Sequence, residues 1–391
     1  MKNKKVAILL PWLKMGGTNK IAINFINELS QYYDVTLILS EKTGELIDNL
    51  PKNINLIIDE MSDFKTILKN DIKHFRVVKF LKDIIYYLKI LLGKDSIDNY
   101  KYIVDRNENI SDIEFDCAIS YHGQSPERLL NLLYRTKSKL KVVWIHGEMA
   151  FSEDKCRRLR KYYQQIDHFF FVSKPTWDSF AKVIPFDETK ATVYYNPIDK
   201  QDILEKSLQQ CESTFDKGYI NLLTVGRVSF EKGQDMIPAI TRNLIDLGYK
   251  VRWYIVGDGD MRPEIEKRIK AEKVEDSIFL LGVKTNPYCY MKACDIYIQP
   301  SYTEGYSTTI CEAAMLGKAI IGTEPSGGIR DQITDEVDGL IVNATVEGLT
   351  EGIIKLLNNH DLKSQFESKI LDKNFEGKDE IIKFLDLIKV F

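Results

Sequence analysis

The chain has 391 residues, of which 44% are hydrophobic, and its formal net charge is −3 at pH 7. Since domains cluster at about 100 to 150 residues, this length suits two domains, and the apolar content can supply two cores. The small net charge gives no support for nucleic acid as a general partner. The six cysteines are scattered without a C-x-x-C pair, which favours free, buried thiols in a reduced cytoplasmic setting.

The amino terminus imitates a signal peptide, because three lysines precede the apolar run VAILLPWL. The run is short, contains Pro11 and passes into the polar KMGGTNK without a small-residue cleavage site. We therefore expect a buried first strand over 6–10. No run approaches the roughly 20 apolar residues that cross a bilayer.

The next segments read as the opening of a Rossmann-like half. A glycine-rich turn at 15–19 precedes a helix over 21–29 and a strand over 35–39. Gly16 and Gly17 allow close approach of backbone to a ligand, although they equally suit a plain turn between strand and helix. The full G-x-G-x-x-G fingerprint is absent, which disfavours a nicotinamide cofactor.

The segment 65–94 is basic and amphipathic, with eight Lys or Arg residues against Asp71 and Asp83. Such a segment can lie on an anionic membrane surface, with lysine stems reaching toward the headgroups. It can equally be a pair of helices with a buried apolar side and a solvated basic side. Both interpretations stay open, so peripheral membrane contact is one expectation.

Two further core strands, 115–120 and 141–145, are followed by His122-Gly123 and His146-Gly147. A histidine at the carboxyl end of a core strand is placed to donate a hydrogen bond or to act as a general acid or base. An ordinary loop histidine with a satisfied hydrogen bond is the alternative. No H-x-x-x-H or carboxylate pattern accompanies them, so no metal site is expected.

The domain junction is expected near Pro197, where a strand gives way to a polar segment. A new series of strands separated by helices follows, at 220–225, 252–256, 278–281, 295–299 and 319–322. The chain therefore divides into a first Rossmann-like domain at 1–197, a second at 198–376, and a final helix at 377–391 that can pack back on the first domain.

Two charged loops follow the first strands of this second series. GRVSFEKG places Arg227 and Lys232 around a tight turn, where they suit a phosphate group or are ordinary loop cations. Asp258 and Asp260 resemble a D-x-D metal pair, but turn and helix-capping roles explain both.

The stretch 295–321 predicts a βαβ unit in which Glu304 and Gly305 lie between a strand and a helix over 307–316. Ligands of open α/β sheets bind at such a junction, and helix amino termini suit phosphates. Glu304 precedes the helix and Glu312 lies inside it, so two acceptors flank the anion site. Two ordinary surface glutamates are the alternative.

Taken in order, the GG turn, WIHG, VGRVSFEKG, VGDGDMRPEIE, SYTEGYSTTICEAAMLGKAII and SGGIRD resemble the retaining glycosyltransferases of family 4. The resemblance covers nearly the whole chain and is strongest over 221–331. It implies the GT-B architecture, an α/β fold of two Rossmann-like domains facing across a cleft. It also implies that the domain at 1–197 binds the acceptor and that the domain at 198–376 binds the nucleotide sugar.

The resemblance also implies roles for individual residues. Arg227 and Lys232 match the pair that binds the donor diphosphate, and Glu312 matches the glutamate that holds the ribose. Glu304 matches the glutamate beside the transferred sugar, and His146 matches a histidine that orients donor or acceptor. His122 has a weaker match on the acceptor side. The remaining donor-binding matches are the amino-domain turn and the diphosphate cradle: Gly16, Gly17, Gly305, Tyr306, Ser307, Thr308 and Thr309.

The implied function is retaining transfer of a hexose from a nucleoside-diphosphate sugar, with UDP as the nucleotide. The acceptor is a saccharide or lipid-linked saccharide of a bacterial surface polysaccharide, reached from the cytoplasm or the inner face of the membrane. No cofactor and no metal are expected. A sugar-nucleotide epimerase of the same fold and a non-catalytic partner subunit are the alternatives.

Overall fold

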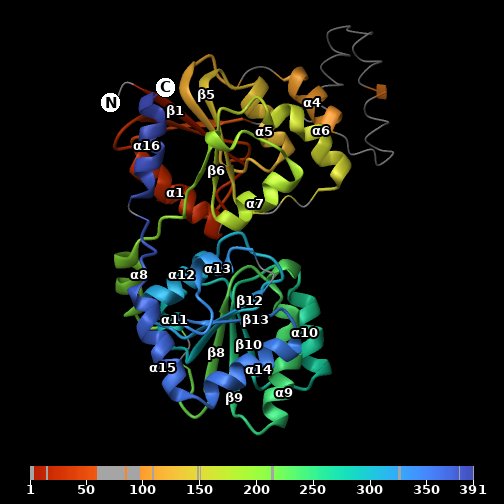
Figure 1. The fold of residues 1–391 in the computed structure, drawn as a ribbon, viewed down its shortest axis with the longest axis vertical. Coiled ribbons are helices and arrows are strands. Elements are labelled where there is room, and N and C mark those ends of the chain that lie inside the picture. Colours follow the sequence, from red (N-terminus) through yellow and green to blue (C-terminus); the bar gives the residue numbers. More distant parts are fainter. Residues whose placement is uncertain are drawn as a thin grey trace. The chain divides into compact units, whose positions relative to one another are not determined.

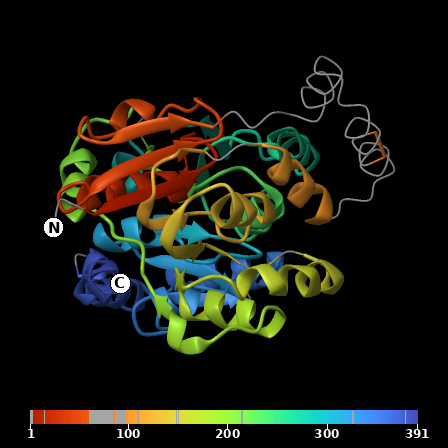
Figure 2. The ribbon, with the colours of Figure 1, turned by 90° about the horizontal axis from the view of Figure 1, so that it is seen from above.

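The computed structural model describes residues 4–14, 16–59, 84–85, 97–107, 110–147, 149, 151–212, 215–324, 327–377 and 379–390. The chain forms two compact units, Met1–Tyr194 with Asp379–Phe391 and Tyr195–Lys378. Both chain ends therefore belong to the first unit (Figures 1 and 2). The basic segment 65–94 lies outside the described residues except for Ile84 and Ile85.

The first unit contains a parallel sheet of seven described strands in the order β3-β2-β1-β4-β5-β6-β7. These strands are β1 (Lys5–Leu10), β2 (Asp34–Leu39), β3 (Asn55–Ile58), β4 (Phe115–Ser120), β5 (Ser138–Ile145), β6 (His168–Phe171) and β7 (Ala191–Val193). The chain moves from β1 outward to β3 and then returns to the other side of β1 with β4. The carboxyl ends of β1 and β4 therefore form a topological switch point, which is where open α/β sheets bind ligands.

Helices pack on this sheet through its apolar side chains. They are α1 (Gly17–Leu29), α4 (Ile97–Arg106), α5 (Pro126–Tyr134), α6 (Glu153–Tyr163), α7 (Lys174–Val183) and α16 (Glu380–Val390). The last helix packs beside α1 (Figure 1). The Phe384 ring lies 5.3 Å from that of Phe25, and the Lys4 ammonium donates to the Ile388 carbonyl at 2.6 Å. The expected first helix begins earlier than predicted, at Gly17.

The second unit contains a parallel sheet of six described strands in the order β10-β9-β8-β11-β12-β13. They are β8 (Ile220–Val225), β9 (Val251–Val256), β10 (Ile278–Gly282), β11 (Ile296–Gln299), β12 (Ile320–Glu324) and β13 (Leu340–Asn343). Its switch point lies between β8 and β11, whose following loops carry the predicted cations and Glu304. The predicted class of two Rossmann-like α/β domains is confirmed.

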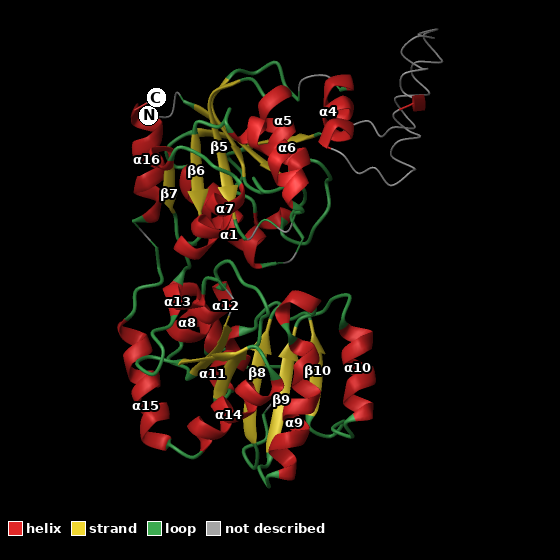
Figure 3. Ribbon diagram, turned by 45° about the vertical axis from the view of Figure 1, so that its right-hand side comes forward, coloured by secondary structure: helices red, strands yellow, loops and turns green. Residues whose placement is uncertain are grey.

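The helices of the second unit fall into two groups that cover its sheet (Figure 3). One group is α9 (Ile237–Asp246), α10 (Arg262–Ala271) and α14 (Val346–Leu357). The other includes α8 (Lys200–Ser207), α11 (Tyr288–Ala293) and α12 (Thr308–Met315). The short α13 (Ile329–Gln332) and α15 (His360–Lys369) complete the described helices of this unit. None of the helices described anywhere in the chain is long and apolar enough to cross a membrane.

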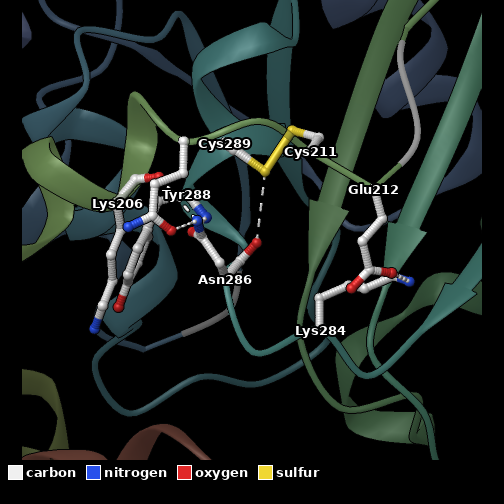
Figure 4. Close-up of a disulfide and its surroundings, with 8 residues drawn as sticks. Lys206, Cys211, Glu212, Lys284, Asn286, Tyr288 and Cys289 are labelled. Atoms are coloured by element: carbon white, nitrogen blue, oxygen red, sulfur yellow. Dashed lines mark hydrogen bonds and ion pairs between the residues drawn. A yellow bond between two sulfur atoms is a disulfide. The ribbon is translucent and has the colours of Figure 1, made fainter.

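One pair of cysteines contradicts the expectation of free thiols. Cys211 and Cys289 form a disulfide, with Cα atoms 5.6 Å apart across a sequence separation of 78. Asn286 supports this junction by donating its side-chain amide to the Lys206 carbonyl at 2.8 Å, and its own backbone carbonyl oxygen lies 3.7 Å from Cys289 Sγ (Figure 4). The pairing arises because α8 and α11 pack together, a long-range contact that cysteine spacing does not reveal. The other four cysteines are free and buried.

Candidate active site

The loop after β8 is fastened to the loop after β11 by its backbone. Gly233 has a φ of 66°, and a Cβ built there would lie 2.0 Å from the Pro300 carbonyl oxygen. Only glycine fits this left-handed position beside another backbone. The Glu231 carbonyl accepts the Tyr302 N–H at 2.9 Å. The two loops of the switch point therefore form one rigid edge.

This edge carries the predicted cations. The Lys232 ammonium lies 2.5 Å from Glu304 Oε2, and both side chains are largely buried, with exposed fractions of 19% and 12%. Arg227 is 71% exposed and pairs with Glu231 at 3.2 Å. Burial opposes ionisation of Glu231, but the Ser229 hydroxyl, its own backbone N–H and the charges of Arg227 and Lys232 together lower its pKa. The structure thus brings Lys232 to Glu304 and leaves Arg227 accessible.

The start of α12 faces the same edge of the sheet. Its N-cap, Ser307, makes no side-chain capping bond, and its first turn contains no acidic residue. The N–H groups of the first turn have no partners within the helix and favour an anion. The predicted cradle over 305–309 needs one correction: the Ser307 N–H already donates to Gln332 Oε1 at 3.0 Å. The N–H groups of Thr308 and Thr309 are the better candidates for phosphate contacts.

The cradle is also fixed from behind by two residues that the sequence reasoning did not single out. The buried Gln332 donates its amide to the Ser307 carbonyl at 2.6 Å. At Gly328 a Cβ would lie 2.0 Å from the Gly305 carbonyl oxygen, and its N–H donates to the Glu304 carbonyl at 2.9 Å. The sequence motif SGGIRD marked this region, but only by resemblance. The structure gives its physical role as a support for the Glu304 loop.

Glu312 lies deeper in α12. It is buried, with 8% exposed, and accepts a hydrogen bond from the Tyr288 hydroxyl at 3.3 Å. Tyr288 was not predicted, because α11 approaches α12 only in the folded chain. The ring of Tyr306 lies 5.4 Å from that of Tyr195, the first residue of this unit. Glu312 is therefore a positioned acceptor rather than a solvated surface glutamate.

The remaining predicted residues lie in the first unit, around its own switch point. Gly16 is the N-cap of α1 and Gly17 is its first residue; both are exposed, and a Cβ at Gly16 would meet nothing within 4 Å. His122 follows β4 and His146 follows β5, with ring centroids 5.7 Å apart. The structure therefore groups the two histidines, whereas Arg227 and Glu304 belong to the other unit.

His146 is held as a neutral imidazole. Burial lowers its pKa well below 6.5, His122 lowers it further, and a hydrogen bond to the Tyr121 backbone partly offsets both. Nε2 has no hydrogen-bond partner among the described residues. Because a bond to a backbone group that raises the pKa is one that the ring donates, the free nitrogen is the one that carries a lone pair. His146 is thus suited to accept a hydrogen bond.

His122 is also neutral. Burial and the charge of Arg128 lower its pKa to about 4. The following Gly123 is required by packing, since a Cβ there would lie 2.6 Å from the Val143 side chain. The Gly123 N–H donates to the Trp144 carbonyl at 2.8 Å, which ties the His122 loop to β5.

The D-x-D pair has local structural roles in part. Asp258 accepts the Gly259 N–H at 2.8 Å and pairs with Arg262 at 3.4 Å. The predicted capping role is wrong, because the N-cap of α10 is Met261 and no side chain caps that helix. Within the described ranges, no group of three or more His, Cys, Asp or Glu residues is arranged to hold a metal ion.

Comparisons with solved structures establish the class to which this fold belongs. Anabaena Alr3699/HepE in complex with UDP and glucose aligns with a TM-score of 0.72 over 100% of both chains, at 15% sequence identity. At this identity the likeness shows the fold alone, which is the two-domain GT-B fold of glycosyltransferases.

Sequence comparisons add a match within the second unit. Residues 206–371 match the family model described as Glycosyl transferases group 1. A Campylobacter jejuni relative, N-acetylgalactosamine-N,N'-diacetylbacillosaminyl-diphospho-undecaprenol 4-alpha-N-acetylgalactosaminyltransferase, is 28% identical over 211 residues, which are 53% of this chain and 55% of the relative. The match therefore spans about half of that relative's length. An uncharacterized glycosyltransferase of Haemophilus influenzae is 24% identical over 363 residues, 90% of each chain.

Proposed function

We propose that the protein is a retaining, metal-independent glycosyltransferase that moves a sugar from a UDP-sugar to a saccharide or lipid-linked acceptor. The observation that carries the proposal is the largely buried pair of Lys232 and Glu304 beside the uncapped start of α12. A cation, a carboxylate and free N–H groups at one switch point suit a ligand that combines a diphosphate with sugar hydroxyls.

In this proposal the second unit binds the donor. Arg227 and Lys232 bind the diphosphate, together with the N–H groups that begin α12. Glu312, held by Tyr288, accepts a hydrogen bond from the ribose. Glu304 accepts one from the transferred sugar through Oε1, since Lys232 and Ser301 both bond to Oε2.

The chemistry follows from where charge develops. Breaking the sugar–phosphate bond leaves negative charge on the diphosphate, and Arg227, Lys232 and the helix start are placed to stabilise it. In front-face transfer the leaving phosphate accepts the proton of the acceptor hydroxyl. His146 of the first unit, with its free Nε2, orients the acceptor or donor through a hydrogen bond. Gly16, Gly17 and His122 contribute from the same unit.

Relatives support the choice of substrates. The Campylobacter relative is named for a diphospho-undecaprenol acceptor, and the Anabaena structure contains UDP and glucose. We therefore propose a lipid-linked acceptor in surface polysaccharide synthesis, reached from the cytoplasm at the inner face of the membrane. The basic segment 65–94 is the proposed contact with anionic lipid, and co-sedimentation with anionic vesicles at low salt tests it.

A donor screen with matched variants tests the activity. Purified protein is mixed with UDP-glucose, UDP-N-acetylglucosamine and UDP-N-acetylgalactosamine, and release of UDP is measured with and without acceptor lipid extract. Lys232→Met, Arg227→Ala and Glu304→Gln should each lower turnover by at least about 100-fold. The control is Lys355→Met, which removes another lysine that pairs with a glutamate, Glu336, on the surface.

Two results would contradict the proposal. Near-normal turnover of Arg227→Ala or Lys232→Met with the true donor would show that the replaced residue is not needed to bind the diphosphate. A wild-type protein that neither binds UDP nor releases it from any of these sugars would favour a non-catalytic subunit. Interconversion of the donor sugar without transfer would instead indicate an epimerase.

A further inference from the structure

A series of hydrogen-bonded, buried polar side chains leads from the sheet to Glu304. It begins at Tyr297 and Gln299 on β11, continues through Ser301, and ends at the Glu304 carboxylate. Tyr297 and Ser301 are fully buried, and Gln299 is 3% exposed. Building on the proposed function, we propose that Ser301 and Gln299 are positioning residues that hold Glu304 on Lys232 and connect it to the start of α12.

The distances define an unbroken series of hydrogen bonds. Gln299 Oε1 accepts from the Tyr297 hydroxyl at 2.8 Å, and Gln299 Nε2 donates to Ser301 Oγ at 2.9 Å. Ser301 Oγ then donates to Glu304 Oε2 at 3.3 Å. The same Glu304 oxygen accepts from Lys232 at 2.5 Å. The carboxylate is therefore held from two sides, by a charged donor and by a neutral hydroxyl.

The direction of each bond follows from the carboxylate. An ionised carboxylate can only accept hydrogen bonds, so the Ser301 hydroxyl must donate its single proton to the Glu304 carboxylate. Ser301 Oγ must then accept from Gln299, which turns the Gln299 amide nitrogen toward Ser301 and its oxygen away. That oxygen can only accept, so Tyr297 must donate to it. One charge at the site thus orders the hydroxyls behind it.

The same glutamine also reaches the proposed phosphate site. Thr309, in the first turn of α12, donates its hydroxyl to Gln299 Oε1 at 3.1 Å. Since its proton is used there, Thr309 Oγ1 accepts from Ser307 Oγ, which lies 3.1 Å away. Gln299 therefore links the helix start to Glu304 from within the buried edge of the sheet. A shift of either group disturbs the other.

The backbone of this segment is fixed independently, so the side chains can be tested alone. The buried Thr323 hydroxyl donates to the Ser301 carbonyl at 2.6 Å. Removing the Ser301 hydroxyl leaves that bond in place. Ser301→Ala should therefore free Glu304 to turn without unfolding the loop.

The test is a double-mutant cycle between Ser301→Ala and Glu304→Gln, read out as UDP release from the donor sugars of the screen. Ser301→Ala should lower kcat/KM about 10-fold, as expected when a hydrogen bond to a charged group is lost. In the Glu304→Gln background, Ser301→Ala should lower kcat/KM by less than a further factor of about 2, because the effects of coupled residues are not additive. Ser301→Thr, which keeps the hydroxyl, should restore most of the activity.

A matched control separates positioning from stability. Thr224 has a buried hydroxyl on the neighbouring strand, which donates to the Ile298 carbonyl at 2.9 Å and accepts from Trp253. Thr224→Val removes it without touching Glu304, so it should lower the midpoint of urea unfolding while leaving kcat/KM within about 2-fold. If Ser301→Ala is too unstable to assay, Gln299→Met should give the same non-additive loss with Glu304→Gln.

The outcomes distinguish this inference from the proposed function. An active wild type in which Ser301→Ala and Glu304→Gln effects multiply would overturn the inference alone. An effect of Ser301→Ala no larger than that of Thr224→Val would do the same. A wild type that neither binds nor releases UDP would overturn the proposed function, and the positioning role with it.

Discussion

Gly233 offers the sharpest test of how the site is built, because its replacement acts on the backbone rather than on a charged group. A Cβ at this position would lie 2.0 Å from the Pro300 carbonyl oxygen, where ordinary contacts begin at 3.4 Å. The loop of Lys232 must therefore move away from the loop of Glu304 in Gly233→Ala. The left-handed conformation adds about 1–2 kcal/mol for a residue other than glycine.

The total effect can be bounded from the contacts at risk. Separation of the loops weakens the bond from the Tyr302 N–H to the Glu231 carbonyl and the pair of Lys232 with Glu304. Each hydrogen bond contributes about 0.5–1.5 kcal/mol. We expect Gly233→Ala to lower the free energy of unfolding by about 2–4 kcal/mol and to weaken UDP binding at least about 10-fold.

The chain offers a matched control in the same loop. A Cβ at Gly226 would meet nothing within 4 Å, so Gly226→Ala should change the free energy of unfolding by less than about 0.5 kcal/mol. Urea unfolding and calorimetric titration with UDP measure the two effects. A Gly233→Ala protein as stable as Gly226→Ala, with unchanged affinity for UDP, would refute the argument that close backbone approach positions Lys232.

Three further predictions concern features outside this loop. Burial keeps the pKa of His168 at about 4 instead of 6.5, so the unfolded chain binds more protons between these values and stability should fall as pH drops from 6.5 to 4. Replacing His168 by Asn should reduce this slope in urea titrations by up to about 1.4 kcal/mol per pH unit. Replacing Cys211 and Cys289 by Ser should lower the free energy of unfolding by up to about 4 kcal/mol, given the separation of 78 residues. Dithiothreitol should destabilise only the wild type. An equal response of the variant to dithiothreitol would contradict the pairing. Gln332→Ala should lower the free energy of unfolding by about 1–3 kcal/mol and weaken UDP binding, because it leaves the Ser307 N–H and carbonyl without their partner. An unchanged affinity for UDP would show that the α12 start does not bind phosphate.

Local pattern was sufficient for much of the fold. The alternation and apolar runs of β4, β8 and β11 predicted their positions, since buried parallel strands read as short hydrophobic runs bounded by turns. The edge strands β3 and β13 were not predicted. Each has only four residues, and neither is buried throughout, because β3 is exposed at its first two positions and β13 at its last. Neither therefore produces the continuous apolar run of a buried strand.

Contacts between loops that are distant in the sequence could not be predicted from local sequence pattern. Arg227, Lys232, Glu304 and Glu312 were found from their places at strand ends and from resemblance to a family. Ser301, Gln299 and Gln332 were missed because a buried polar side chain has no periodic signature. Its role depends on which partner the fold brings within hydrogen-bond distance.

The two series of strands and the loops that carry chemical groups follow from local sequence, because turn residues and hydrophobic periods act over a few residues. Which of these groups meet depends on the folded chain. Lys232 and Glu304 are 72 residues apart, and they pair because β8 and β11 are neighbours in the sheet order. That order depends on long-range packing, and the disulfide, the support from Gln332 and the polar chain behind Glu304 depend on it in the same way.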